Sequence, residues 1–420
     1  MVSRPAPLED TPFRRRFSVR GTFAALQYPN YRLWFYGQMV SLMGTWMQST
    51  AQGYLMYELT NSPIYLGYVG FAAGLPSWIF MLYGGLAADR MPRRNLMIIT
   101  QTAMMLLALI LAGLTFTHLV QPWHIIVLAF LLGVANAFDA PARVSFVTEL
   151  VDRKDLTNAI ALNATMFNTA TATGPAVGGL VYAAVGPAWC FTLNAISFLA
   201  VIVALALMKI QKTARVALKK SVIKDIQEGF RYVSSQLVVR TLMVNVLILG
   251  MFGLSFVILM PAWAVTVLGG DATTNGYLQS ARGIGALFGA LTLASVSGVA
   301  PKGKLITWGG LIFPALLIVF ALINFLPLSL LLLVGIGFWF VFFINSANAL
   351  IQSLVPDELR GRVMSIYTLT FFGSMPIGSL VAGSVAERIG EPAMVILGAG
   401  AVLAYALFVL LRVPQVRQSD

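Results

Sequence analysis

The feature that most restricts this chain is a succession of long apolar stretches that charged residues hardly interrupt. Apolar residues make up 58% of the 420 residues, and charged residues only 10%. A water-soluble protein of this length cannot cover its surface with so few charges, because its interior is too small to hide that much apolar side chain. Lipid must solvate the rest. Because the stretches are unbroken rather than alternating, they predict membrane-spanning helices and argue against a β-barrel.

Twelve stretches are long enough to cross a bilayer, whose core needs about 20 apolar residues per helix. Gly, Pro, Asn and clusters of charge separate them. We therefore expect an all-α membrane protein. The predicted spans are 31–57, 63–87, 95–117, 122–142, 158–184, 188–208, 241–267, 274–297, 304–325, 327–350, 363–386 and 392–412.

The placement of Lys and Arg tests this number of spans, because cytoplasmic loops hold most of the positive charge. With the N-terminus inside, every basic residue except Arg282 and Arg388 belongs to a cytoplasmic segment. One span more or fewer would move about half of them to the opposite side. We therefore expect a protein of the inner cell membrane with both termini in the cytoplasm.

The predicted organisation has one long hydrophilic connector between two sets of six helices. Within it, Ile226, Phe230 and Val233 recur at helical spacing among basic residues, which predicts an amphipathic helix along the cytoplasmic surface. A disordered linker is the alternative. The predicted segments are a tail at 1–30, a first half at 31–208, the linker at 209–240, a second half at 241–412 and a tail at 413–420.

Composition narrows the classes of function. The net charge of +12 follows from positive-inside bias and attraction to anionic membrane lipid, so it does not indicate nucleic-acid binding. With a single cysteine, Cys190, and two histidines, His118 and His124, a disulfide framework or metal site is not expected. We expect no cofactor. An intramembrane enzyme would need a cluster of acids, bases or metal ligands, which the spans lack.

The two halves carry an internal repeat. Residues 150–186 align with residues 354–390 without a gap. Three glycines stay in register, which apolar composition alone would not produce. The pairs are Gly174 with Gly378, Gly179 with Gly383, and Gly186 with Gly390. Because six helices separate the repeated elements, the halves run in the same direction, which predicts two parallel pseudo-repeats with a substrate site between them.

The first span carries a polar stripe. Steps of three and four residues place most of its polar side chains on one face, too polar to contact lipid. They either line an internal cavity or form hydrogen bonds between helices. The residues are Gln38, Ser41, Thr45, Gln48, Ser49 and Gln52.

Two ionisable residues within spans are functional candidates, because charge inside a bilayer is unfavourable. Arg282 lies about two turns into its helix, where an unpaired guanidinium would cost roughly 2.5 kcal/mol or more. It either reaches outward or bonds locally, or it faces a wet cavity and takes part in transport. Asp139 is the best candidate for carrying a proton. A helix-end ion pair with Arg143, four residues on, is the favoured alternative.

The loop between the second and third spans holds a glycine, an acidic residue and several basic residues. A glycine lets two helix ends approach, and an aspartate can bind a neighbouring helix end or arginine. The segment 85–94, with Pro92 where glycine is usual, is similar to motif A of the major facilitator superfamily. The resemblance implies that Asp89 latches the outward-facing state. It also implies a gating role for four neighbours, Gly85, Arg90, Arg93 and Arg94, and for the three arginines simple positive-inside anchoring is the alternative.

The fifth span contains small residues and a proline, which permit close packing and kink a helix. This segment resembles motif C, the antiporter motif of drug exporters in the same superfamily, although Ala170 replaces its upstream glycine. The resemblance implies a gating role, and simple packing is the alternative. The residues are Gly174, Pro175, Gly178 and Gly179.

Three further segments, 30–34, 139–143 and 355–363, resemble the enterobactin-exporter-like branch of the superfamily. The resemblance implies gating by Arg360, Gly361 and Arg362, and a central cavity lined by the first, fourth, seventh and tenth spans. Amides and aromatics there suit an amphipathic organic molecule. The cavity residues it adds are Asn136, Asn245, Trp339 and Asn345.

The resemblance implies a secondary active transporter that exports a small amphipathic molecule, such as a siderophore or drug, by alternating access. A proton gradient is the expected energy source, since no nucleotide-binding motif is visible. We expect the protein to act as a monomer. An importer, uniporter or lipid transporter of the same fold is the alternative, because a fold does not determine direction or cargo.

Overall fold

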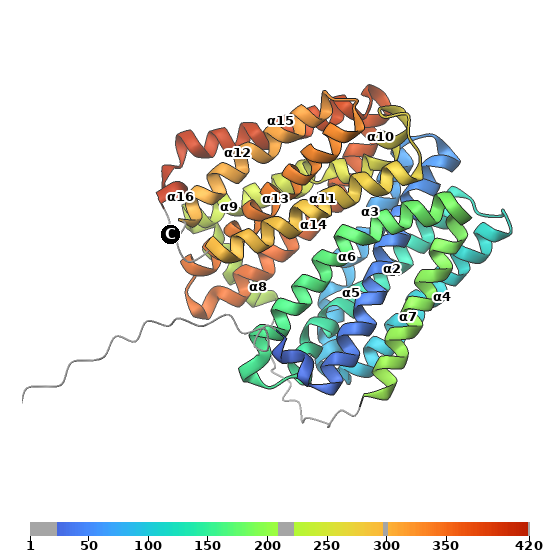
Figure 1. Ribbon diagram of the computed structural model, residues 1–420. Helices are drawn as coiled ribbons and strands as arrows, with labels where there is room; N and C mark the ends of the chain where they lie inside the picture. The colour runs from blue at the N-terminus through green and yellow to red at the C-terminus, as the bar shows by residue number, and fades with distance from the viewer. Residues whose placement is uncertain (1–22, 209–221, 297–300, 419–420) are drawn as a thin grey trace, which may run out of the picture.

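Every element in the described part of the chain is a helix. The computed structural model describes residues 23–208, 222–296 and 301–418, and no strand occurs in these ranges. Figure 1 shows the helices in two groups, one coloured blue to green and the other yellow to red. The first group, which we call the N-half, comprises α2–α7, and the second, the C-half, comprises α9–α15.

The helices of the N-half lie at the ranges expected for the first six spans. They are α2 (Pro29–Thr60), α3 (Pro63–Arg90), α4 (Arg93–Phe116), α5 (Pro122–Leu150), α6 (Leu156–Val185) and α7 (Pro187–Leu207), with 3₁₀ turns at η1 (Ala24–Gln27) and η2 (Arg153–Asp155).

The C-half follows an amphipathic helix, α8 (Val222–Ser235). Its elements are α9 (Leu237–Ile248), η3 (Leu249–Gly253), η4 (Ser255–Leu259), α10 (Met260–Thr266), α11 (Ala272–Val296), α12 (Lys302–Ala321), α13 (Leu326–Leu354), α14 (Asp357–Ile389), α15 (Glu391–Arg412) and the short α16 (Pro414–Gln418).

Local sequence explains many helix ends. Proline stands in the first turn of α2, α3, α5 and α7, where its fixed φ suits a helix and its missing N–H costs no bond. Two glycines of the internal repeat end α6 and α14. Gly186 has φ +92° and Gly390 has φ +85°, a backbone conformation that other residues rarely adopt. This explains why that pair stays in register.

Nine helices in the described ranges, counting Leu237–Thr266 as one, are long and apolar enough to cross a membrane. The chain is therefore a multi-pass membrane protein. The other predicted spans, α2, α6 and α11, carry many amide and hydroxyl side chains. α6 packs against both α2 and α11, so these polar helices bury much of their surface in protein. That twelve helices cross the membrane stays a prediction.

The seventh predicted span is broken rather than continuous. A π-helical stretch, η3, and a 3₁₀ stretch, η4, separate α9 from α10. Gly250 in η3 packs directly against the hydroxyl of Ser374 on α14, where a larger side chain would clash. Apolar periodicity does not reveal such a break, because it depends on a neighbouring helix.

The predicted amphipathic helix is present as α8, which packs against α14. Gly229 is buried there, and a Cβ atom on it would lie 3.2 Å from Cβ of Arg362. Tyr232 Oη donates a hydrogen bond to the Leu354 carbonyl at 3.2 Å. Part of the predicted linker, 209–221, lies outside the described residues.

The two halves meet where α3 crosses α14 and where α6 crosses α11. Glycines let the backbones approach: a Cβ atom on Gly383 would lie 2.7 Å from the Pro63 carbonyl oxygen, and one on Gly179 2.6 Å from the Ala272 carbonyl oxygen. We call the side of the molecule where α3 begins and α14 ends the Ser62 end. The opposite side, where α3 ends and α14 begins, is the Asp89 end.

Candidate functional site

The Ser62 end is joined across the two halves by a carboxylate. Glu387 of α14 accepts a hydrogen bond from Ser62 Oγ at 2.6 Å and one from the Ile64 backbone N–H at 3.3 Å. Ser62 precedes α3, so the carboxylate sits at the positive N-terminus of that helix and satisfies a free backbone donor. Sequence reasoning missed Glu387, because nothing in the local pattern shows that α14 ends beside the start of α3.

At the Asp89 end, no carboxylate of the described residues bridges α3 and α14 in this way. Asp89 and Arg90 are exposed, and neither side chain forms a hydrogen bond or ion pair within the described ranges. A Cβ atom on Gly85 would meet nothing within 4 Å, so this glycine makes no close approach to another helix in this structure, and its gating role stays a prediction. Its neighbour Gly84 makes the approach instead, against the carbonyl oxygen of Ala137 on α5.

The other basic residues of this loop bind within the N-half. Arg93 Nη1 forms an ion pair with Glu149 Oε1 at 2.8 Å and donates to the Ser145 carbonyl at 3.0 Å. Arg94 Nη2 donates to the Ala206 carbonyl at 2.7 Å. These bonds tie the start of α4 to the ends of α5 and α7.

The first turns of α14 also form local bonds. Arg360 Nη2 pairs with Asp357 Oδ1 at 2.5 Å, and its Nε donates to the Gln352 carbonyl at 3.1 Å. Arg362 Nη1 pairs with Glu228 of α8. A Cβ atom on Gly361 would meet nothing within 4 Å. Of this group, Arg362 is therefore the residue that bonds the linker helix to α14.

The small residues of α6 pack against two helices. Cβ atoms on Gly174 and Gly178 would lie 2.6 Å from Cβ of Trp46 and 2.9 Å from the Met47 carbonyl oxygen, both on α2. Gly179 faces α11. After Pro175, the Ala176 N–H donates to Ser280 Oγ of α11 at 2.8 Å. This segment therefore holds α6 against α2 and across the half-interface.

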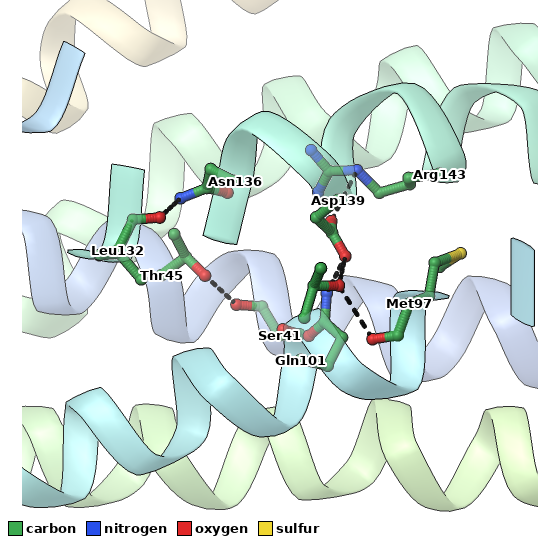
Figure 2. A network of polar contacts seen from close by, with 9 residues as sticks. Ser41, Thr45, Met97, Gln101, Leu132, Asn136, Asp139 and Arg143 are labelled. Atoms are coloured by element: carbon green, nitrogen blue, oxygen red, sulfur yellow. Dashed lines mark hydrogen bonds and ion pairs between the residues drawn. The ribbon is translucent and has the colours of Figure 1, made fainter. Parts of the chain in front are cut away.

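The polar side chains of α2 differ in their contacts: one bonds to another helix, one bonds within α2, and one has an oxygen without a partner in the described ranges. Gln48 is buried and accepts a 2.7 Å bond to Oε1 from Asn194 Nδ2 on α7, which is the helix-to-helix alternative. Thr45 Oγ1 donates to the Ser41 carbonyl at 2.9 Å, as Figure 2 shows. Gln38 is buried, and its Oε1 has no hydrogen-bond partner in the described part of the chain.

The other expected cavity residues are not joined by any bond to one another. Asn136 Nδ2 donates to the Leu132 carbonyl of its own helix at 3.2 Å (Figure 2). Asn245 is buried in α9, Asn345 is exposed on α13, and Trp339 packs on Phe342 with ring centroids 5.7 Å apart. Their role in a cavity stays a prediction.

Asp139 is fully buried between α5 and α4. Its Oδ1 accepts hydrogen bonds from Thr100 Oγ1 at 2.8 Å and from Gln101 Nε2 at 3.1 Å. Its Oδ2 lies 3.8 Å from Arg143 Nε, the ion pair favoured by the sequence (Figure 2). The carboxylate is thus bonded inside the N-half, and no cluster of three His, Cys, Asp or Glu that could hold a metal ion occurs in the described ranges.

Arg282 lies on α11 beside two buried amides that sequence reasoning missed. Asn275 is fully buried and Gln279 is 9% exposed. Gln279 Nε2 donates to Asn275 Oδ1 at 3.1 Å, and Asn275 Nδ2 lies 3.5 Å from the Thr50 carbonyl oxygen of α2. Gln279 lies three residues and Asn275 seven residues before Arg282, a spacing that places all three on one face and that the sequence already contained.

The other face of α11 borders an apolar groove of about 700 Å³ between α6, α11 and α13. Several of its side chains are largely exposed, as expected for positions that lipid covers. The lining includes Val177, Leu180, Tyr277, Ile284, Leu331 and Val334.

Comparison with known families and proteins places the chain among transporters. The family model described as "Transmembrane secretion effector" matches residues 20–420. The staphyloferrin A transporter of Staphylococcus aureus is 24% identical, over 86% of this chain and 90% of that protein. The multidrug efflux pump Tap of Mycolicibacterium fortuitum is 27% identical, over 80% and 84% of the two chains. Macrolide efflux protein A of Streptococcus pyogenes is 24% identical, over 87% and 92%.

Solved structures share the fold at low sequence identity. A POT family transporter in complex with 5-aminolevulinic acid has a TM-score of 0.73 at 12% identity, over 92% of this chain and 96% of the other. A bacterial homologue of the human lysosomal transporter Spinster, in an inward-facing and unoccupied conformation, has a TM-score of 0.67 at 13% identity, over 96% and 97%.

Proposed function

The chain belongs to the transmembrane secretion effector family, a group of major facilitator transporters, and from this premise we propose that it exports small amphipathic compounds in exchange for protons. The relatives named as a siderophore transporter and as drug and macrolide efflux proteins support export and this kind of cargo. The cargo is moved by alternating access around a site between the two halves.

The observation that carries the proposal is the difference between the two ends of α3. At the Ser62 end Glu387 bridges the halves, and glycines bring α3 and α14 into backbone contact. At the Asp89 end, Asp89 is exposed and has no partner in the described ranges. Alternating access requires such an asymmetry, because the halves close on one side of the substrate while they part on the other.

We assign the Asp89 end to the cytoplasm of an inner-membrane protein. The basic residues of the turns at this end support the assignment, because cytoplasmic loops retain Lys and Arg. The structure then represents an inward-facing state. In the opposite state Asp89 finds its partner across the halves, and the bonds of Glu387 break.

We further propose twelve spans in two parallel six-helix repeats, acting as a monomer in contact with membrane lipid. The similar positive-φ glycines that end α6 and α14, Gly186 and Gly390, support the repeat. The polar helices α2, α6 and α11 cross the membrane because they bury polar surface against one another.

Asp139 remains the candidate for proton coupling among the acidic residues within spans. It is fully buried, and its Oδ2 has only the distant Arg143 as a partner. Movement of α5 relative to α4 would change the bonds that Thr100 and Gln101 donate to its Oδ1, which would link this carboxylate to the state of the transporter.

The proposal is tested by transport in sealed vesicles with a panel of siderophores and dyes, with and without an imposed pH gradient. Gradient-dependent movement away from the cytoplasmic face is expected. Movement that does not depend on the gradient would replace it with facilitated or lipid transport, and would remove Asp139 as a proton carrier.

A further inference from the structure

The guanidinium of Arg282 lies near the middle of α11 without a counter-ion. At 1.5 Å per residue, it is about 15 Å along the helix from Ala272. In the described ranges no carboxylate forms an ion pair with it, and its Nε has no hydrogen-bond partner. The acidic residue nearest to the middle of a span, Asp139, is already bonded within the N-half.

The backbone around Arg282 is held on two sides. A Cβ atom on Gly283 would lie 2.5 Å from the Thr171 carbonyl oxygen of α6. Gly337 of α13 packs directly against the carbonyl oxygen of Arg282, and Gly285 against that of Val334. With the backbone in this position, and with a side chain shorter than its depth in the helix, the charge does not reach the end of α11.

Arg282 instead continues a stripe of amides. Asn275, Gln279 and Arg282 recur at helical spacing on one face, and Asn275 contacts Thr50 of α2 in the N-half. The opposite face, with Tyr277 and Ile284, borders the apolar groove. The stripe is therefore directed at the interface between the two halves, where the proposed function places the cargo.

We propose that Asn275, Gln279 and Arg282 form a recognition site for an oxyanion, and that the cargo is an amphipathic molecule carrying a carboxylate. This inference rests on the proposed function. A guanidinium binds a carboxylate through paired hydrogen bonds, and it does so strongly where water is scarce. Because no carboxylate in the described ranges pairs with Arg282, the ligand supplies the counter-ion. The amides of Asn275 and Gln279 on the same face give further hydrogen-bonding groups.

A phosphate on a lipid headgroup has the same chemistry, so the test separates the two sources. The purified full-length protein is titrated in detergent with a dansyl-aminoundecanoic acid probe and with its methyl ester. A parallel series adds the protein to nanodiscs with or without phosphatidylglycerol. We expect the acid to bind at least about tenfold more tightly than the ester, the size of an effect from one well-placed charge pair.

The variants are Arg282→Gln, Arg282→Lys and Gln279→Leu. Arg282→Gln is expected to lose the preference for the acid over the ester, Arg282→Lys to keep part of it, and Gln279→Leu to weaken it. Arg240→Gln is the matched control, since Arg240 is an exposed arginine of the same half near the Asp89 end. If Arg282→Gln fails to fold, the other two variants still test the site.

Equal binding of the acid and the ester by the wild-type protein would overturn the inference. So would an unchanged preference in Arg282→Gln, or displacement of the acid by phosphatidylglycerol, which would make this a lipid site. Export of an uncharged dye tests the proposed function separately. If dye export depends on the pH gradient while the acid shows no preference, only the anion site is wrong. If no compound is exported, the proposed function fails and the binding data still decide the site.

Discussion

The two ends of α3 differ in how they meet the C-half. At the Ser62 end, a carboxylate from α14 accepts bonds from a side chain and a backbone N–H of the other half, and Gly67 packs with Gly383. At the Asp89 end, Asp89 in the last turn of α3 is exposed, and its side chain forms no bond in the described ranges. The same pair of helices is thus joined at one end and free of such bonds at the other.

This difference teaches that a carboxylate can bond the two halves together only where a helix of the other half lies within hydrogen-bonding distance. Glu387 does so through the N-terminus of α3, whose free N–H groups and dipole favour an anion. Asp89 has the same chemistry, but its side chain has no partner in the described part of the chain. A transporter that alternates between two states needs both kinds of end, because each bond can stabilise only one of the states.

The largest effect is expected from breaking the packing at the Ser62 end. In Gly383→Val, the added atoms would collide with the Pro63 carbonyl oxygen and Gly67. We expect the population to shift toward the state closed at the Asp89 end by about 100-fold, which would stop turnover. Spin labels at Asn61 and Arg388, in a Cys190→Ala background, report the distance across the Ser62 end.

Gly400→Val is the matched control, because a Cβ atom at Gly400 would meet nothing within 4 Å. It should leave the distance distribution and transport as in the parent. If Gly383→Val also leaves both unchanged, close packing of α3 on α14 does not hold this state.

The second-largest effect is a loss of transport, and it is expected from a substitution at the Asp89 end. Asp89→Asn should lower transport by about tenfold, within the usual range of coupling between two states, because it weakens only the state closed at the Asp89 end. Spin labels at Lys154 and Glu358 should lose the short-distance population that appears with cargo. Asp152→Asn is the control at the same end, because Asp152 accepts its bond from Tyr28 within the N-half. Unaltered transport and distances in Asp89→Asn would contradict the latch.

A smaller effect is expected from the hydrogen bond at the Ser62 end. Ser62→Ala and Glu387→Gln should each widen the distance between labels at Asn61 and Arg388, and the double variant should add little more. A double-mutant cycle should give a coupling of about 1 kcal/mol, roughly fivefold in the equilibrium between states. Fully additive effects would mean that the two side chains do not act together.

The smallest effect on transport is expected at the contact between α8 and α14, because this contact is not one of the two ends of α3. Arg362→Gln removes a partly exposed ion pair with Glu228, and such pairs contribute about 0–1 kcal/mol. Hydrogen exchange in α8 should quicken while transport changes little. Arg360→Gln, whose charge binds Asp357 of α14, should leave α8 protected. A large loss of transport in Arg362→Gln would instead favour the gating role that the sequence implied.

Much of the helical framework could be predicted because its signals are local. Apolar stretches, prolines in first turns and the glycines at 186 and 390 act through backbone geometry of their own segment. The break between α9 and α10 could not be predicted, because Gly250 matters only through Ser374 of another helix.

The site was predicted less completely. Gln48 forms a hydrogen bond with Asn194 within the N-half, which is one of the two alternatives that the sequence left open, and Gly84 rather than Gly85 makes the close approach to α5. Neighbouring positions on a helix point about 100° apart, so a pattern that identifies a polar or small-residue stripe does not choose the partner. Their spacing places Asn275 and Gln279 on the same face as Arg282, yet only the tertiary structure shows that both amides are buried.

The sequence by itself determined that this is a helical membrane protein, where its helices run and to which superfamily it is similar. It could do so because a helix in lipid must satisfy its backbone within its own segment. Only the tertiary structure decided which carboxylate bridges the halves, which glycines bring helices together and that Arg282 has no counter-ion in the described chain. Those properties arise from contacts between residues far apart in the chain, and no local pattern encodes them.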